Sequence, residues 1–127
     1  MNIVLSIAAG GALGAVIRHF INVGMGIVTP FNMLPLGVFV VNIVGSFLMG
    51  VAVAAFANGI EVSQSMRAFL TVGLLGGFTT FSAFSFEAVK LIEKQAFGLA
   101  AIYIGASVII SIFSLFAGLW IMRGALS

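Results

Sequence analysis

Four long apolar stretches dominate the sequence and restrict the folds that the chain can adopt. They run from about Ile3 to Val28, Leu36 to Ala57, Met66 to Ile92 and Phe97 to Met122. Each could cross the ~30 Å hydrocarbon core of a bilayer, which needs about 20 helical residues. The chain is 62% hydrophobic and 6% charged, against about 45–50% and about 25% in soluble domains. It therefore predicts an all-α membrane protein, with a single four-helix transmembrane domain over residues 1–127.

Turn-forming residues separate these stretches. Pro30 and Pro35 lie between the first two, Asn58 and Gly59 follow the second, and a polar segment around Lys94 follows the third. Such residues favour turns over continued helix. We therefore expect four spans joined by short connections.

The few basic residues do not favour one orientation in the membrane. Four spans place Arg67 and Arg123 on one side, and Lys90 and Lys94 on the other. The positive-inside rule gives almost no preference when each side of the membrane has two basic residues. Two interpretations stay open. Either a weak bias, such as Arg18 or the N-terminal amine, decides the orientation, or copies insert both ways and pair as an antiparallel, dual-topology homodimer.

Small residues recur at a spacing of four, which allows helix backbones to approach closely in lipid. The pairs are Gly10 with Gly14, Ser46 with Gly50, and Gly73 with Gly77. They predict tight helix packing. Whether the partner helix belongs to the same chain stays open.

The segment "GGFTTFSAFSFE" places helix breakers and hydroxyls inside the third apolar stretch. Gly76 and Gly77 favour the end of a helix, and a hydroxyl residue after them favours a new start. The candidate N-caps are Thr79, Thr80 and Ser82. The segment predicts that the third helix is broken at its centre. Freed carbonyls at such a break suit a cation, and the N-terminus of the second half suits an anion.

Two further sets of side chains need a reason to lie in an apolar helix. Asn42 sits near the middle of the second span, and a stripe of one tyrosine and three serines follows one face of the fourth (Tyr103, Ser107, Ser111 and Ser114). Asn42 either joins helices or donates a hydrogen bond along a pathway. The hydroxyls either bond back to their own helix or form a polar seam.

Phe81 and Phe84 are three residues apart, as are Ser82 and Ser85, so each pair shares a face of the second half-helix. Phenyl rings carry a positive edge. The two rings could contact an anion with their edges, or could serve ordinary packing.

The segments "GGFTTFSAFS", "GGALGAVIR" and "GVFVVNIVGS" together resemble the Fluc (CrcB) family of bacterial fluoride channels. The resemblance covers essentially the whole chain. It implies an antiparallel homodimer of four-helix subunits in the bacterial cytoplasmic membrane, with two fluoride pores and a central structural sodium ion. The implied function is passive, fluoride-selective export that relieves fluoride toxicity, and not an enzymatic reaction.

The resemblance also implies roles for individual residues. The backbone carbonyls of Gly76 and Thr79 would bind the sodium ion from both subunits. The ring edges of Phe81 and Phe84 would line the pores, and Asn42 would donate its amide to fluoride.

A polar track and a vestibule complete the implied pathway. The track would continue through Tyr103, Ser107, Ser111, Ser85 and Glu87. Arg18 would lie by the aqueous vestibule. One departure is that family members often carry hydroxyls near the start of the second-helix motif, where this chain has Val38 and Val40.

Two other functions compete with the channel. A small dual-topology multidrug or cation exporter would need a carboxylate within the membrane, and Glu87, toward the end of the third span, is the candidate. A non-transporting assembly subunit would need neither a broken helix nor a hydroxyl stripe.

Overall fold

A computed structural model describes residues 2–28 and 36–126 of the chain, and the structure of this part is helical. In chain order its helices are α1 (Ile3–Val28), α2 (Leu36–Ala57), α3 (Gln64–Ala68), the π-helix η1 (Phe69–Leu75), α4 (Gly76–Phe78), α5 (Phe81–Glu93) and α6 (Phe97–Leu126). Over these ranges there is no strand. The turn expected at Pro30 and Pro35 lies outside the described residues.

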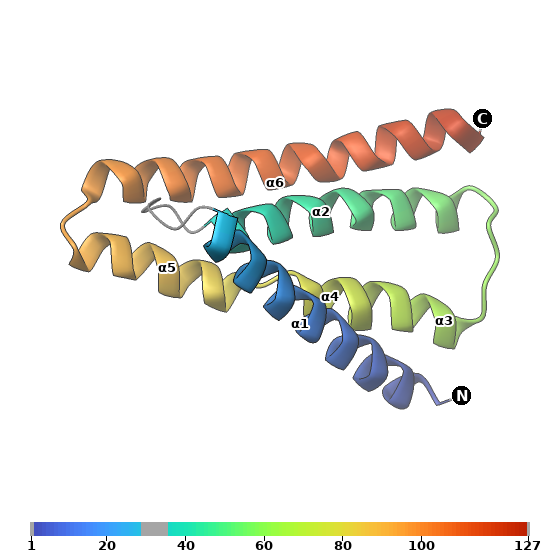
Figure 1. Ribbon diagram of the computed structural model, residues 1–127. Helices are drawn as coiled ribbons and strands as arrows, with labels where there is room; N and C mark the ends of the chain where they lie inside the picture. The colour runs from blue at the N-terminus through green and yellow to red at the C-terminus, as the bar shows by residue number, and fades with distance from the viewer. Residues whose placement is uncertain (1, 29–35, 127) are drawn as a thin grey trace.

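Four segments are long and apolar enough to cross a membrane: Ile3–Met25, Leu36–Ala57, Gln64–Glu93 and Phe97–Leu126. The third consists of α3, η1, α4 and α5 in succession. The two ends of the chain lie at the same end of the molecule, and the α5–α6 turn lies at the other (Figure 1). The expected four-helix membrane fold is confirmed, and the protein is a multi-pass membrane protein.

The connections follow from local backbone chemistry. Gly59, with φ of 107°, ends α2 in the left-handed region that glycine adopts without strain. The Ile60 N–H then donates to the Ala55 carbonyl at 3.1 Å. Ser63 caps α3, since its hydroxyl accepts from the Met66 N–H at 3.1 Å.

The helices α2 and α6 run side by side in the same direction (Figure 1). Glycine makes this close approach possible from both sides. A Cβ at Gly50 would collide with the Leu115 carbonyl and lie 3.0 Å from the Leu119 N. A Cβ at Gly118 would lie 2.9 Å from the Val51 N. The pairing of α2 with α6 therefore depends on backbone contact at these two glycines.

The helix α1 crosses the first half of the third span obliquely (Figure 1). A Cβ at Gly10 would lie 2.5 Å from the Phe69 carbonyl oxygen, and one at Gly77 would lie 2.6 Å from the Gly11 carbonyl oxygen. The glycine pairs of α1 and of the third span thus meet each other within one chain. This resolves the question that the sequence left open.

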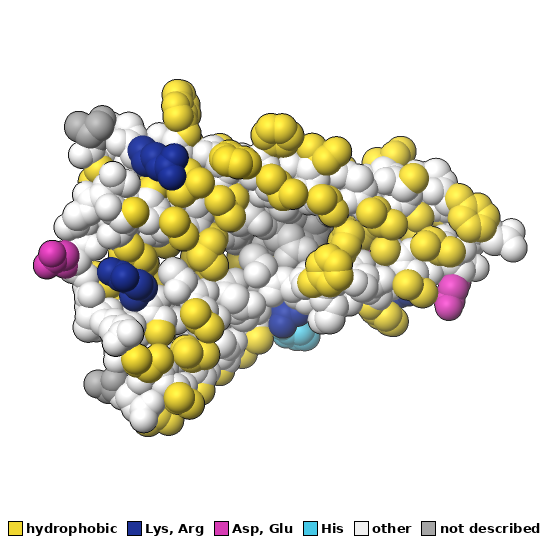
Figure 2. All heavy atoms as spheres, turned by 180° about the vertical axis from the view of Figure 1, so that it is seen from behind, with side chains coloured by type: hydrophobic (Ala, Val, Ile, Leu, Met, Phe, Trp, Pro, Cys, Tyr) yellow, Lys and Arg dark blue, Asp and Glu magenta, His cyan; other side chains and the backbone are white. Residues whose placement is uncertain are grey.

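The space between α2, α5 and α6 is filled by a small buried cluster. Its members are Val38, Phe84, Ala88, Leu91, Ala100 and Tyr103. Most other large apolar side chains point outward, and hydrophobic side chains spread over the face shown in Figure 2. Trp120 on α6 is 78% exposed and Phe113 is 67% exposed. This is the pattern of helices that meet lipid rather than water.

A candidate ion pathway at the helix break

The third span is interrupted at Thr79 and Thr80. Their backbones are extended, with φ and ψ of −83° and 159° at Thr79 and −155° and 124° at Thr80. The expected broken third helix is therefore confirmed, but Gly76 and Gly77 do not form the break. They remain helical in α4, and Gly77 serves close packing against α1 instead.

Thr80 is the N-cap of α5. Its hydroxyl accepts a hydrogen bond from the Ala83 N–H at 3.0 Å and lies 3.3 Å from the Ser82 hydroxyl. Thr79 belongs to the preceding half, because its hydroxyl donates to the Leu75 carbonyl at 3.0 Å. Of the three hydroxyl residues considered as caps, Thr80 is the one that fills the role.

The turn before the break is a π-helix, which the sequence analysis did not anticipate. In η1 the helix is wound more widely than an α-helix, and the Gly76 N–H donates to the Thr71 carbonyl across its end. The Thr71 hydroxyl donates to the Arg67 carbonyl at 2.8 Å. No pattern in the side chains from Phe69 to Leu75 predicts this winding.

Asn42 joins α2 to the break by two hydrogen bonds. Its Nδ2 donates to the Thr80 carbonyl at 3.0 Å, and its Oδ1 accepts from the Thr80 N–H at 2.8 Å. Of the two interpretations from the sequence, the link between helices is therefore present. The second Nδ2 hydrogen is not used by these bonds, because an amide nitrogen carries two.

Two backbone carbonyls lose their usual donors at the break. In a continuous α-helix the N–H of residue i+4 bonds the carbonyl of residue i. The Thr80 N–H, the helical donor for Gly76, turns to Asn42, and the Ala83 N–H, the helical donor for Thr79, turns to the Thr80 hydroxyl. The Gly76 and Thr79 carbonyls are thereby left available to another partner. Neutral carbonyl oxygens are ligands that suit a hard cation.

A groove of about 220 Å³ opens beside the break. It lies between α2, the start of α5 and the middle of α6. Five residues expected on the ion pathway line it: Asn42, Phe81, Phe84, Ser107 and Ser111. Ser46, Thr80, Val108 and Ile112 also line it, and these had no pathway role in the sequence analysis. The step of four from Asn42 to Ser46 is the signal that could have revealed Ser46.

Three aromatic rings form a row from the groove into the core. The centroids of Phe81 and Phe84 are 5.4 Å apart at 52°, and those of Phe84 and Tyr103 are 5.3 Å apart at 38°. Phe81 is 76% exposed in the single subunit, whereas Phe84 is 8% exposed. The two phenylalanines therefore differ in role: Phe84 packs inside the subunit, and Phe81 projects from it.

The hydroxyls of α6 form a polar seam. The Tyr103 hydroxyl, the Ser107 Oγ and the Ser111 Oγ are buried, and none has a hydrogen-bond partner among the described residues. These three hydroxyls therefore do not bond back to carbonyls of their own helix. Ser114, the last of the stripe, is half-buried farther along α6. Buried hydroxyls without partners can bind whatever enters the groove.

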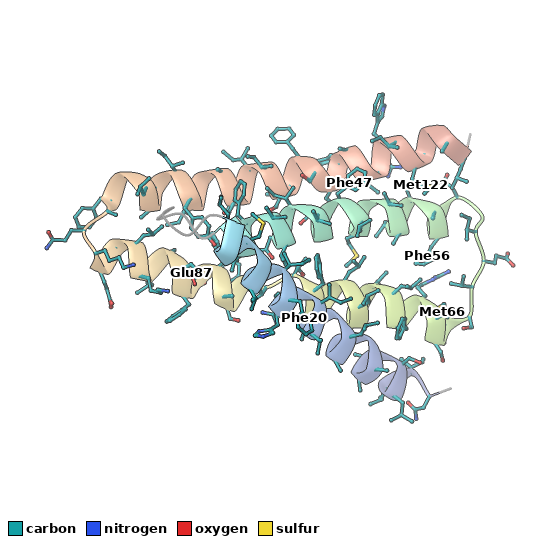
Figure 3. The ribbon with its side chains drawn as sticks, in the orientation of Figure 1. Phe20, Phe47, Phe56, Met66, Glu87 and Met122 are labelled. Carbon is teal, nitrogen blue, oxygen red and sulfur yellow. The ribbon has the colours of Figure 1, made fainter. Side chains whose placement is uncertain are left out.

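The remaining expected residues lie apart from the groove lining. Glu87, labelled on α5 in Figure 3, forms an ion pair with Lys90 at 3.6 Å. Ser85 is half-buried on the same helix. Arg18 is on α1, with its Nε buried and without a partner among the described residues. Val38, at the departure from the family motif, is buried in the core cluster. The structure thus separates a groove at the break from charged positions elsewhere on the subunit.

Together these features define a membrane protein whose broken helix carries a polar and aromatic groove. Comparison with known proteins agrees with this class. Residues 5–119 match the model of the family described as CrcB-like protein, Camphor Resistance (CrcB). The chain belongs to this family.

Curated relatives cover nearly the whole chain. A fluoride-specific ion channel FluC of Rhodospirillum centenum is 45% identical over 129 residues, 100% of both chains. The protein of the same name from Agrobacterium fabrum is 49% identical over 97% of each chain. That of Cereibacter sphaeroides is 50% identical over 94% of each.

Proposed function

We propose that this protein is a fluoride-selective channel that exports fluoride passively. The observation that carries the proposal is the groove at the helix break, where an amide, three serine hydroxyls and two phenyl rings meet. Fluoride is small and strongly hydrated, so a pore must offer close hydrogen-bond donors in place of water. These donors must bind the ion favourably, but weakly enough that it can leave. The full-length similarity to proteins named fluoride-specific ion channels supports the same ion.

The groove favours a channel over a proton-coupled exporter. An exporter of organic cations needs a membrane carboxylate that binds protons and substrate in turn. Among the described residues, the groove lining includes no aspartate or glutamate. Glu87 lies instead beside Lys90, which is a poor arrangement for binding a cationic substrate.

The functional unit in this proposal is an antiparallel homodimer. Phe81 and Gly76 are both exposed beside the break, where a second copy could cover them. An inverted partner agrees with the balance of two basic residues against two. Pairing across the break would close an open groove into a pore.

A sodium ion between the subunits completes the proposed assembly. The available carbonyls of Gly76 and Thr79 fit such an ion, because the break removes their helical donors. When bound, the ion supplies a positive charge that holds together the broken third spans of the two subunits. The chain's own contribution is to keep these carbonyls out of ordinary helical bonding.

The remaining residues have proposed places along the fluoride path. The ring edges of Phe81 and Phe84 and the free hydrogen of the Asn42 amide contact the ion. The α6 hydroxyls continue the track through Tyr103, Ser107 and Ser111. Ser85 and Glu87 extend it, and Arg18 lies at a vestibule.

Fluoride efflux from liposomes tests the proposal directly. Purified protein should release loaded fluoride rapidly, with no proton gradient and with little chloride release. Glu87→Gln is the discriminating variant. It should leave passive efflux present, whereas it would abolish a carboxylate-dependent exporter. Silence in the parent protein would support an assembly subunit, and uptake of organic cations driven by a proton gradient would support the exporter.

A further inference from the structure

Asn42 is engaged in a way that ion donation alone does not explain. Its side chain bonds both backbone groups of Thr80, a residue 38 positions away on another span. A primary amide presents one acceptor and one donor side by side, and both are used here on a single residue. An ion donor would not need to hold a backbone carbonyl and N–H together.

We propose that Asn42 is a positioning residue whose amide holds the interruption of the third span in place, and through it the Gly76 carbonyl and the Phe81 ring. Its consequence for ion flow rests on the channel function proposed above. The two hydrogen bonds between the Asn42 amide and the Thr80 backbone, called the clamp below, do not depend on that function.

The first step concerns the Gly76 carbonyl. In a continuous helix the Thr80 N–H would donate to Gly76. The Asn42 Oδ1 accepts this N–H instead, at 2.8 Å. Removing the acceptor leaves the Thr80 N–H without this partner, and the extended backbone at Thr79, which frees the Gly76 carbonyl, loses a support. The amide of Asn42 therefore keeps that carbonyl available.

The second step concerns the start of α5. The Asn42 amide fixes the Thr80 backbone, and the Thr80 hydroxyl caps the helix by accepting from the Ala83 N–H at 3.0 Å. Phe81 is the first residue of α5, so its direction follows from the backbone of Thr80. Loss of the clamp would let Phe81 change its place in the groove.

The two sides of the interruption are held by different means. The preceding side is fixed by close packing: a Cβ at Gly14 would lie 2.7 Å from the Phe78 N, and one at Gly45 would lie 3.1 Å from the Phe78 ring. The following side is held by the two hydrogen bonds from Asn42. A change at Asn42 should therefore loosen the residues from Thr80 onward more than those before it.

Hydrogen exchange followed by mass spectrometry tests the clamp without measuring transport. The purified protein is compared in sodium chloride and in N-methylglucamine chloride. Asn42→Leu should speed exchange in the peptide covering residues 78–84 by about tenfold, the effect of losing two partly buried hydrogen bonds. Asn42→Asp keeps the acceptor for the Thr80 N–H but loses the donor to the Thr80 carbonyl, so its exchange there should rise by about threefold, less than in Asn42→Leu.

Ser107→Ala is the matched control for this measurement. Ser107 lines the same groove, but its hydroxyl bonds to none of the described residues, the break included. The variant should leave exchange at residues 78–84 unchanged, and it should leave the sodium concentration that supports the dimer unchanged. Asn42→Leu should raise that sodium concentration by about tenfold.

The outcomes separate the clamp from the channel. Parental exchange in Asn42→Leu, or loosening in Ser107→Ala equal to that in Asn42→Leu, would overturn the clamp. If Asn42→Leu does not fold, Asn42→Asp decides, because parental exchange at residues 78–84 despite the lost donor to the Thr80 carbonyl would also overturn the clamp. A parent that shows the expected exchange but no fluoride efflux would contradict the channel and leave the clamp standing.

Discussion

The ring of Phe84 packs on that of Tyr103 with centroids 5.3 Å apart and planes inclined by 38°. This contact joins α5 to α6 in the buried cluster, where the two residues are 8% and 3% exposed. It also places the Tyr103 hydroxyl, which has no partner among the described residues, near the row of groove-lining rings. One aromatic contact thus holds both the subunit core and one wall of the groove.

The first prediction concerns the phenyl rings. Phe81→Ile keeps an apolar side chain but removes the ring's positive edge. We expect fluoride efflux to fall by more than about tenfold, equivalent to about 1.4 kcal/mol on the barrier, with the proposed dimer intact. Phe84→Ile should cut efflux as strongly, and should also cost about 1 kcal/mol of stability, because Phe84 is buried in the core. Efflux is measured in liposomes at matched protein density.

Phe56→Ile is the control for both substitutions. Phe56 lies near the α2–α3 connection, away from the break (Figure 3), with the Arg67 guanidinium 5.1 Å from its ring centroid. Its loss should leave efflux within a few-fold of the parent. Near-normal efflux in Phe81→Ile and Phe84→Ile would instead assign both rings to packing.

The second prediction concerns packing of α1 against the third span. Gly77→Ala should lower the thermal stability of the subunit by about 1–3 kcal/mol, because the new Cβ would lie 2.6 Å from the Gly11 carbonyl oxygen. Gly105→Ala on α6 is the matched control, since it meets no heavy atom within 4 Å. It should be neutral or stabilising by up to about 1 kcal/mol through better helix propensity. Thermal unfolding in detergent, followed by circular dichroism, compares them, and equal stabilities would contradict the close approach.

The third prediction separates side chain from backbone at the proposed sodium site. Thr79→Ala should keep sodium-dependent dimerisation, because the carbonyl survives although the bond from Thr79 Oγ1 to Leu75 is lost. Gly76→Leu should impair it. The nearest atom to a Cβ at Gly76 is the Thr71 carbonyl oxygen at 3.5 Å, so the subunit itself can accept a side chain there. Dimer content by size exclusion, with sodium replaced by N-methylglucamine, is the measurement. No change in either variant would mean that the site is misplaced.

The fourth prediction concerns orientation. The chain contains no cysteine, so a single Glu61→Cys in the exposed α2–α3 connection reports its side of the membrane without ambiguity. Dual topology predicts that about half of the protein reacts with a membrane-impermeant maleimide from each side. Val41→Cys, at a position that is 0% exposed, should not react. Labelling of Glu61→Cys from one side only would contradict the inverted pair.

The amino-acid sequence by itself determined the features that depend on local pattern. The four spans follow from the length of the apolar stretches, because a bilayer requires about 20 apolar residues per helix. The shared face of Tyr103, Ser107 and Ser111 follows from helical spacing. The broken third span follows from the capping chemistry of its hydroxyls, although the glycines that also suggested it remain helical.

Only the tertiary structure decided which of these features meet. The break lies at Thr79 and Thr80 rather than at the glycines, because packing against α1 keeps Gly77 helical. The tertiary structure joined Asn42 to Thr80 across 38 positions and brought Ser46 into the groove. Such contacts depend on how far each helix is rotated and how closely the backbones approach, and these are set by several helices at once. Periodicity within one helix shows which residues share a face, but the partner of that face is chosen by packing across the whole subunit.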